Sequence, residues 1–210
     1  MLKLTRRLAT AARLLRGGRG DELGYRLWNR WKGLDLAFIP VADLGLPADR
    51  AHGHGSSGGP ALARIVTTIG VPRGSVAVDL GSGKGGAALT LSRLGFEEVI
   101  GVELSEDLIR IARRNAERLG RRNVRFVHAD AGAFRDYDRV THVYMFNPFP
   151  AEVMSDVIAN LRESLARFPR VVTILYVNPA YPQAIESSGL FDPGPEGLLE
   201  QHVWRVYRSR

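Results

Sequence analysis

The chain contains no cysteine among its 210 residues. This absence excludes disulfides, a thiol nucleophile and a metal site built from thiolates, and it fits a reducing compartment such as the cytoplasm. Long apolar runs are missing too, because no stretch approaches the roughly 20 apolar residues of a membrane-spanning helix. Lysine is scarce: Lys3, Lys32 and Lys84 are the only ones, so arginine carries most of the positive charge. We therefore expect a cytoplasmic protein.

The positive charge is uneven along the chain. The formal net charge is +7, and no acidic residue precedes Asp21. Leu4, Leu8 and Leu15 recur at helical spacing and predict an amphipathic helix at the N-terminus. Residues 1–19 could contact an anionic surface, lipid or nucleic acid, which would make the protein peripheral to a membrane in the first case. The same helix could instead dock on its own domain.

A glycine-rich break and an aromatic segment follow this helix. Gly17-Gly18-Arg19-Gly20 is typical of a hinge, and a second helix is expected over residues 22–33. We therefore divide the chain into a basic, aromatic, helical extension (residues 1–50) and a main domain (residues 51–210). His52 and His54 have the spacing of two metal ligands, but no third ligand adjoins them, so no metal site is predicted.

The most informative stretch is Val76-Ala77-Val78-Asp79-Leu80-Gly81-Ser82-Gly83-Lys84-Gly85-Gly86. Its first half is a short apolar run of strand length that ends in a carboxylate. The glycines after it allow a tight turn and a close approach of the backbone to a ligand. The stretch predicts a buried strand, a glycine-rich turn and then a helix.

Three nucleotide-binding patterns compete for this turn. A phosphate-binding P-loop requires G-x-x-x-x-G-K-[ST], but Val78 and Gly85 stand where the first Gly and the Ser/Thr belong, so it is rejected. The dinucleotide pattern G-x-G-x-x-G is satisfied by Gly81, Gly83 and Gly86 but is weak alone. The third pattern, D-x-G-x-G-x-G, begins at Asp79.

Strand and helix patterns alternate after residue 76, which predicts a parallel sheet with helices on both faces. Expected strands cover 76–80, 98–102, 124–128, 140–146, 171–177 and 201–208; expected helices cover 60–69, 85–94, 105–119, 151–167 and 180–187. Pro193-Gly194-Pro195 is expected in the turn before the last strand. Ligands of such sheets bind beyond the carboxyl ends of the strands. Polar residues follow or end five of these strands: Asp79, Glu103, Asp130, Asn147 and Asn178.

Four segments together resemble the motifs of class I S-adenosylmethionine (SAM) methyltransferases. They are Val78–Gly85, Gly101–Ser105, Ala129-Asp130-Ala131 and Phe146-Asn147-Pro148-Phe149, in the family's order and spacing. The last one departs from the family's [DN]-P-P-[YF], because its second proline follows the aromatic residue. The resemblance implies an α/β fold with a doubly wound, mostly parallel seven-strand sheet, and SAM as the cofactor.

The resemblance also implies residue roles. Gly81, Ser82, Gly83 and Gly85 would wrap the methionine part of the cofactor, and Asp79 would bind its ammonium group. Glu103 would accept the ribose hydroxyls, Leu104 would lie along the adenine, and Asp130 and Ala131 would bind the adenine edge. Asn147, Pro148 and Phe149 would align the acceptor, and Asn147 would also border the cofactor.

The predicted activity is SAM-dependent methylation, with nitrogen of a protein side chain or an amine as the expected acceptor atom. The acceptor itself, whether protein, small amine or RNA, is not identified, and His54, His142 and Tyr176 are candidate bases by type only. One alternative is an NAD-dependent oxidoreductase, although this sequence has no evident Tyr/Lys pair for hydride transfer. The other is a non-catalytic basic adaptor that binds nucleic acid or anionic lipid.

Overall fold

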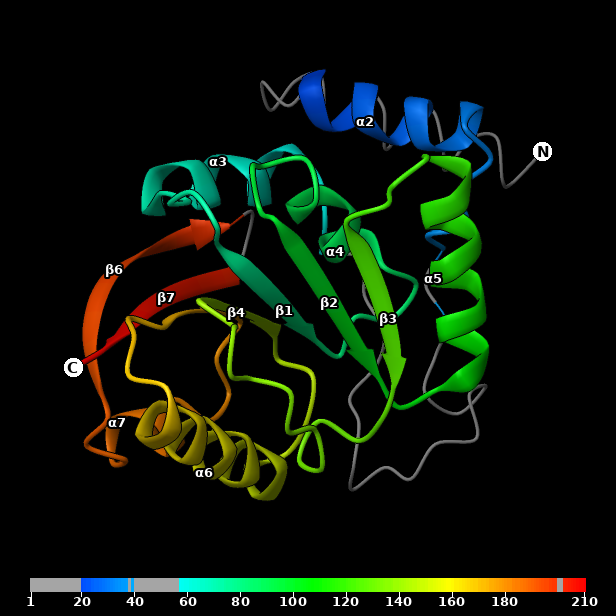
Figure 1. Cartoon of the computed structure of the whole chain (residues 1–210). Coiled ribbons are helices and arrows are strands. Elements are labelled where there is room, and N and C mark those ends of the chain that lie inside the picture. The colour runs from blue at the N-terminus through cyan, green and yellow to red at the C-terminus, as the bar shows by residue number, and fades with distance from the viewer. Residues whose placement is uncertain (1–19, 38, 40–56, 200–201) are drawn as a thin grey trace.

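The computed structural model describes residues 20–37, 39, 57–199 and 202–210 (Figure 1). Its centre is a seven-stranded sheet with the order β3-β2-β1-β4-β5-β7-β6. The strands are β1 (Val76–Leu80), β2 (Glu98–Glu103), β3 (Val124–His128), β4 (His142–Phe146), β5 (Thr173–Val177), β6 (Phe191–Leu199) and β7 (His202–Ser209). The pairs among β1 to β5 are parallel, and β7 is antiparallel to both β5 and β6. The expected mostly parallel, seven-strand fold is confirmed.

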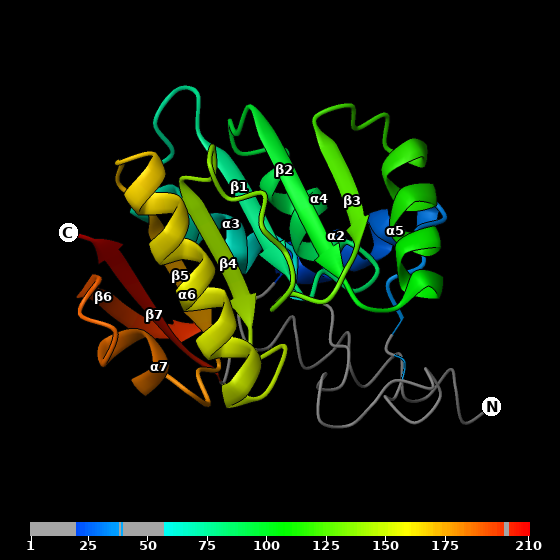
Figure 2. The same cartoon turned by 60° about the horizontal axis from the view of Figure 1, so that its bottom comes forward.

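Helices cover both faces of the sheet, as alternating strand and helix patterns require (Figure 2). They are α2 (Gly20–Trp31), α3 (Pro60–Ile69), α4 (Gly86–Leu91), α5 (Glu106–Arg118), α6 (Ala151–Arg167) and α7 (Gln183–Glu186). The side chains of β1 alternate between two buried clusters. Val76, Val78 and Leu80 pack with α6 and α7, and Ala77 packs with α3, α4 and α5. Both faces are therefore buried, which explains the unbroken apolar run.

Helix α2 lies over the helical layer on the α3, α4 and α5 side (Figure 1). Oε1 of buried Glu22 accepts the Ala61 amide at the start of α3 over 3.0 Å. Arg93, beyond α4, lies over the Trp28 ring at 5.4 Å, and Arg118 at the end of α5 donates to the Gly33 carbonyl. The second helix of the expected extension thus docks on the main domain.

One expected turn is wrong. Pro193, Gly194 and Pro195 lie inside β6 and not in a loop before the last strand. The β6–β7 ladder shifts between Pro193 and Glu196, and β6 is an edge of the sheet. Proline is tolerated at edges and bulges, where its missing amide breaks no central ladder, so a proline-rich segment forms a strand here.

Several expected element ends are also too long. The strands expected from 140 and 171 begin at His142 and Thr173, and the helix expected to 94 ends at Leu91. The predicted start of the next helix is confirmed, since the Ser105 hydroxyl accepts the Leu108 amide as an N-cap. Residues 1–19 and the domain boundary at residue 50 lie outside the described residues. Within the part of the chain that the structure describes, every helix is too short or too polar to cross a membrane.

Candidate functional site

The glycine loop joins β1 to α4 at the carboxyl end of the sheet. Gly81, Gly83 and Gly85 have φ values of 75°, 53° and 84°, a left-handed region that favours glycine. A Cβ at Gly81 would lie 2.4 Å from Cβ of Pro148, and one at Gly85 would lie 2.8 Å from the Phe126 ring. The loop therefore needs glycine for its conformation and for its packing, and it lies directly against the segment after β4.

Two buried carboxylates flank this loop. Asp79 is 2% exposed, and its Oδ2 accepts the Ala88 amide of α4 over 3.0 Å. Glu103 is 8% exposed, and its Oε2 accepts the Gly83 amide while its Oε1 accepts the Ser105 amide, each over 2.9 Å. An ionised carboxylate has about four lone-pair sites, so Glu103 can accept further hydrogen bonds from a ligand. The ends of β1 and β2 thus hold the loop between two acids.

Burial raises the pKa of both acids. Desolvation, with a smaller contribution from the neighbouring Glu103 charge, raises the pKa of Asp79 to about 7, against the hydrogen bond from Ala88. Burial also raises the pKa of Glu103, although hydrogen bonds from Ser105 and Gly83 oppose this shift. In the described residues, neither carboxylate forms an ion pair with a lysine or arginine. A cationic ligand would therefore supply the charge that the site lacks.

The structure brings the remaining predicted cofactor residues to the same edge. The Ser82 hydroxyl is buried next to Gly101 and has no hydrogen-bond partner among the described residues. Asp130 follows β3, and its Oδ1 accepts the Gly132 amide over 2.7 Å. Ala131 is buried beside it, and Leu104 follows Glu103 at the end of β2. Polar groups of three neighbouring strand ends therefore converge, which fits a cofactor with several polar parts.

The segment after β4 has a strained start. Asn147 has a φ of 38°, which asparagine tolerates better than most residues, and its amide donates to the Val177 carbonyl. Pro148 packs on Gly81. Phe149, however, is 3% exposed and belongs to the core cluster that contains α6. The structure places Asn147 and Pro148 beside the glycine loop, but it places Phe149 in the core and not on a pocket wall.

The candidate bases do not gather at this edge. His142 begins β4, at the opposite end of that strand, and contacts the Thr141 hydroxyl and the Gly70 carbonyl. Tyr176 is the next-to-last residue of β5, and its side chain is fully buried in the core. His52 and His54 lie outside the described residues. In residues 20–37, 57–199 and 202–210, no three His, Cys, Asp or Glu side chains group as metal ligands.

Sequence reasoning missed an ion pair beside the loop, between a buried lysine and a half-exposed aspartate. The Lys84 side chain is 3% exposed, and its ammonium lies 2.6 Å from Asp35 Oδ1. Nδ2 of Asn115 on α5 donates to the Asp35 carbonyl over 2.9 Å and to the Lys84 carbonyl over 3.0 Å. Asp35 follows α2 and is distant in sequence from both partners. The one available signal was a lone lysine inside a glycine motif of an arginine-rich chain.

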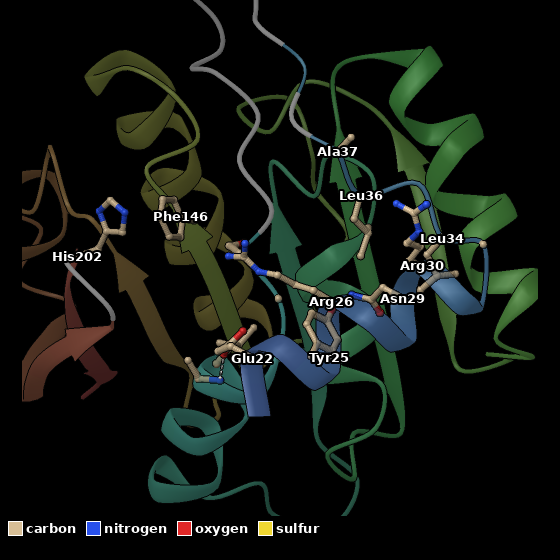
Figure 3. A pocket seen from close by; sticks show the side chains of 15 residues that line it. Glu22, Tyr25, Arg26, Asn29, Arg30, Leu34, Leu36, Ala37, Phe146 and His202 are labelled. Carbon is tan, nitrogen blue, oxygen red and sulfur yellow. Dashed lines mark hydrogen bonds between the residues drawn. The ribbon is translucent and has the colours of Figure 1, made fainter. Parts of the chain in front are cut away.

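A cavity of about 660 Å³ lies between α2 and the carboxyl edge of the sheet (Figure 3). We call it the α2 cavity. Its polar wall comes mainly from α2, and its apolar wall comes from the segment after α2, from α3 and from the end of β4. The lining residues are Glu22, Tyr25, Arg26, Asn29, Arg30, Gly33, Leu34, Leu36, Ala37, Ser57, Gly58, Ala61, Leu62, Phe146 and His202.

Comparisons with known proteins agree with this geometry. Residues 77–167 match a family model described as a methyltransferase domain. The protein-L-isoaspartate O-methyltransferase of Thermotoga maritima is 36% identical over 102 residues, which cover 47% of this chain and 32% of that relative. The chain thus matches about a third of the length of this curated relative.

Two solved structures share the fold. A SAM-dependent methyltransferase from Aquifex aeolicus has a TM-score of 0.58 and 16% identity, over 70% of this chain and 88% of its own. An RNA methyltransferase from Salinibacter ruber, solved with S-adenosyl-L-homocysteine (SAH), has a TM-score of 0.53 and 24% identity, over 71% and 89%. At these identities the likeness concerns the fold alone.

Proposed function

We infer that this chain, whose residues 77–167 match a methyltransferase domain model, is a SAM-dependent methyltransferase of class I. The observation that carries the proposal is the pair of buried carboxylates, Asp79 and Glu103, on either side of a glycine loop. Among the described residues neither is ion-paired with a lysine or arginine, since Lys84 of the loop pairs with Asp35. SAM carries two positive centres, an ammonium and a sulfonium. Its binding would offset the repulsion and desolvation of these two acids.

The residues present fit the cofactor part by part. The backbone of the loop turns with positive φ values at Gly81, Gly83 and Gly85, and the methionine part would lie along this backbone. Asp79 would bind the ammonium group, and the free lone pairs of Glu103 would accept the ribose hydroxyls. The buried hydroxyl of Ser82 lacks a partner among the described residues and would gain one.

The end of β3 would hold the other half of the cofactor. Asp130 would accept from the adenine amino group, Ala131 would offer its amide, and Leu104 would lie along the adenine face. When bound, SAM supplies an activated methyl group on sulfur for in-line displacement. The protein's own task is to position the acceptor atom and exclude water from it.

For the acceptor atom we propose nitrogen, in a protein side chain or an amine. Asn147 has a strained backbone and directly precedes Pro148, which packs on the glycine loop. An amide oxygen can accept a hydrogen bond from an acceptor N–H and so orient the nitrogen lone pair. We also propose that residues 1–50 act as an extension of the domain at 51–210, and that residues 1–19 contact an anionic surface.

The experiment separates binding from turnover. Calorimetry should detect SAH binding to the wild-type chain, and Asp79→Ala should abolish it because the ammonium loses its counter-charge. Asn147→Ala should retain SAH binding but lose transfer of labelled methyl groups from SAM to cell-extract fractions. Micromolar SAH binding by a folded Asp79→Ala variant would contradict the proposal. Binding of NAD in place of SAH would favour an oxidoreductase.

A further inference from the structure

We propose that the α2 cavity is the acceptor site and that it takes a small molecule with a carboxylate or phosphate group. This inference rests on the proposed function, because it names the class of acceptor that the same enzyme would methylate. It is carried by the cavity's position, by two arginines on one helix face, and by a buried amide that lacks a partner.

Three lining residues of the α2 cavity connect it to the glycine loop. Phe146 directly precedes Asn147 at the end of β4. Leu36 directly follows Asp35, whose carboxylate binds Lys84 of the loop. A Cβ at Gly58 would lie 2.1 Å from the Gly86 carbonyl, so that wall touches the end of the loop. A molecule in the cavity would therefore lie next to the proposed methyl donor.

The charged groups of the cavity favour an anion. Arg26 and Arg30 are one helical turn apart on α2, both line the cavity and both are exposed. In Figure 3 the Arg26 side chain extends from α2 toward Phe146. Among the described lining residues the only acid is Glu22, and its Oε1 already accepts the Ala61 amide. Two guanidinium groups can bind a carboxylate or phosphate through paired hydrogen bonds.

A buried amide adds a second requirement on the ligand. Asn29 lies between the two arginines on α2, lines the cavity and is 8% exposed. Its Oδ1 has no hydrogen-bond partner among the described residues. Buried acceptors are costly when they are left without a donor. The ligand should therefore carry an N–H or O–H group as well as its acid.

The size and the apolar wall indicate a small molecule. A volume of about 660 Å³ falls within the range typical of small-molecule sites. Tyr25, Leu36 and Phe146 supply flat and apolar surface opposite the polar groups. The geometry thus fits a compact acid with an apolar body.

The test uses the full chain saturated with SAH and three fluorinated probes. These are 4-amino-3-fluorobenzoate, 4-amino-3-fluorophenyl phosphate and uncharged 4-amino-3-fluorobenzamide, so that all three carry an N–H donor, with binding measured by fluorine NMR line broadening. At least one of the two acids should bind more tightly than the amide. The acid that binds more tightly shows whether the site prefers a carboxylate or a phosphate. The double variant Arg26→Gln/Arg30→Gln should weaken acid binding about tenfold or more.

Two further variants make the outcome specific. Arg73→Gln removes one positive charge by the same substitution at an exposed site before β1, at the opposite edge of the sheet, and should leave acid binding unchanged. Asn29→Asp should weaken acid binding by repulsion. Equal binding of all three probes, or unchanged acid binding in the double variant, would overturn the inference. Failure of the wild type to bind SAH would instead overturn the proposed function.

Discussion

Asp79 is the residue whose chemistry most directly links the fold to ligand binding. It is buried near the end of β1, and desolvation raises its pKa to about 7. A protonated Asp79 cannot attract an ammonium group. The affinity for the cofactor should therefore depend on pH in the neutral range, where ordinary carboxylates do not titrate.

We predict that SAH binds about ten times more weakly at pH 6 than at pH 8. With a pKa of about 7, Asp79 is mostly protonated at pH 6 and mostly ionised at pH 8. The affinity rises with pH because only the ionised form of Asp79 attracts the ammonium group. Calorimetry at the two pH values measures this, and Asp79→Asn should bind weakly and without the pH dependence. A flat wild-type profile would count against the role of Asp79.

Gly81 permits a second prediction at this scale, with Gly95 as a matched control. Both have positive φ values, 75° and 91°. A Cβ at Gly81 would lie 2.4 Å from Pro148, whereas a Cβ at Gly95 would have no atom of the described residues within 4 Å. Gly95→Ala should cost about 1–2 kcal/mol of unfolding free energy from backbone strain. Gly81→Ala should cost about 1–3 kcal/mol more because of overpacking.

Urea denaturation measures both glycine variants, and SAH calorimetry adds a functional reading. The Gly81→Ala variant should also lose SAH affinity, because Pro148 must move away from the loop, whereas Gly95→Ala should not. Equal costs in the two variants would mean that Pro148 adjusts freely and that the close packing is unimportant.

Among the elements, the segment after α2 has the strongest contacts with the glycine loop. Asp35 binds the ammonium of Lys84, and its main chain exchanges two hydrogen bonds with the Asn115 side chain. Asn115 also holds the Lys84 carbonyl. The N-terminal segment, the loop and α5 are therefore joined at one place. We expect the docking of α2 to depend more on this contact than on the exposed ion pair between Asp21 of α2 and Arg64 of α3.

We predict that Asp35→Ala lowers the free energy of unfolding by about 1–3 kcal/mol, because it leaves the buried Lys84 ammonium without its partner. The control is Asp21→Ala, which removes the ion pair between α2 and Arg64. Both partners there are exposed, so its loss should cost far less than that of Asp35, because surface ion pairs contribute little to stability. Hydrogen exchange of the α2 amides should rise in the Asp35 variant alone. Equal exchange in both variants would refute the coupling.

The order of strands determines the site at the scale of the whole molecule. β1 lies between β2 and β4, so the chain crosses in opposite directions on its two sides. Such a switch point opens a crevice beyond the carboxyl ends of the strands. The glycine loop, Glu103 and Asn147 all lie at this crevice.

We predict that SAH stabilises the whole chain and that NAD does not. A ligand that binds only the folded state adds about 2.7 kcal/mol at 100 times its dissociation constant. A thermal melt with each ligand measures the shift, and Asp79→Ala serves as the variant that should not respond. A shift with NAD and none with SAH would restore the oxidoreductase alternative.

The sequence by itself determined all the helices and strands described here except β6. It also determined which edge of the sheet carries the motifs. Hydrophobic period, the Ser105 cap and the glycine turn are local signals, and each of them specified a strand, a helix start or a loop that the structure contains. Parallel topology then required Asp79, Glu103 and Asp130 to lie at one edge, because parallel strands end on the same side. That part of the site was predictable.

Only the tertiary structure decided the rest. The ion pair of Lys84 with Asp35, the core position of Phe149 and the α2 cavity depend on which surfaces pack together. β6 formed through Pro193 because it is an edge strand with a shifted ladder. Such long-range packing leaves no periodic trace in the chain, since its partners are far apart in sequence and share no local pattern.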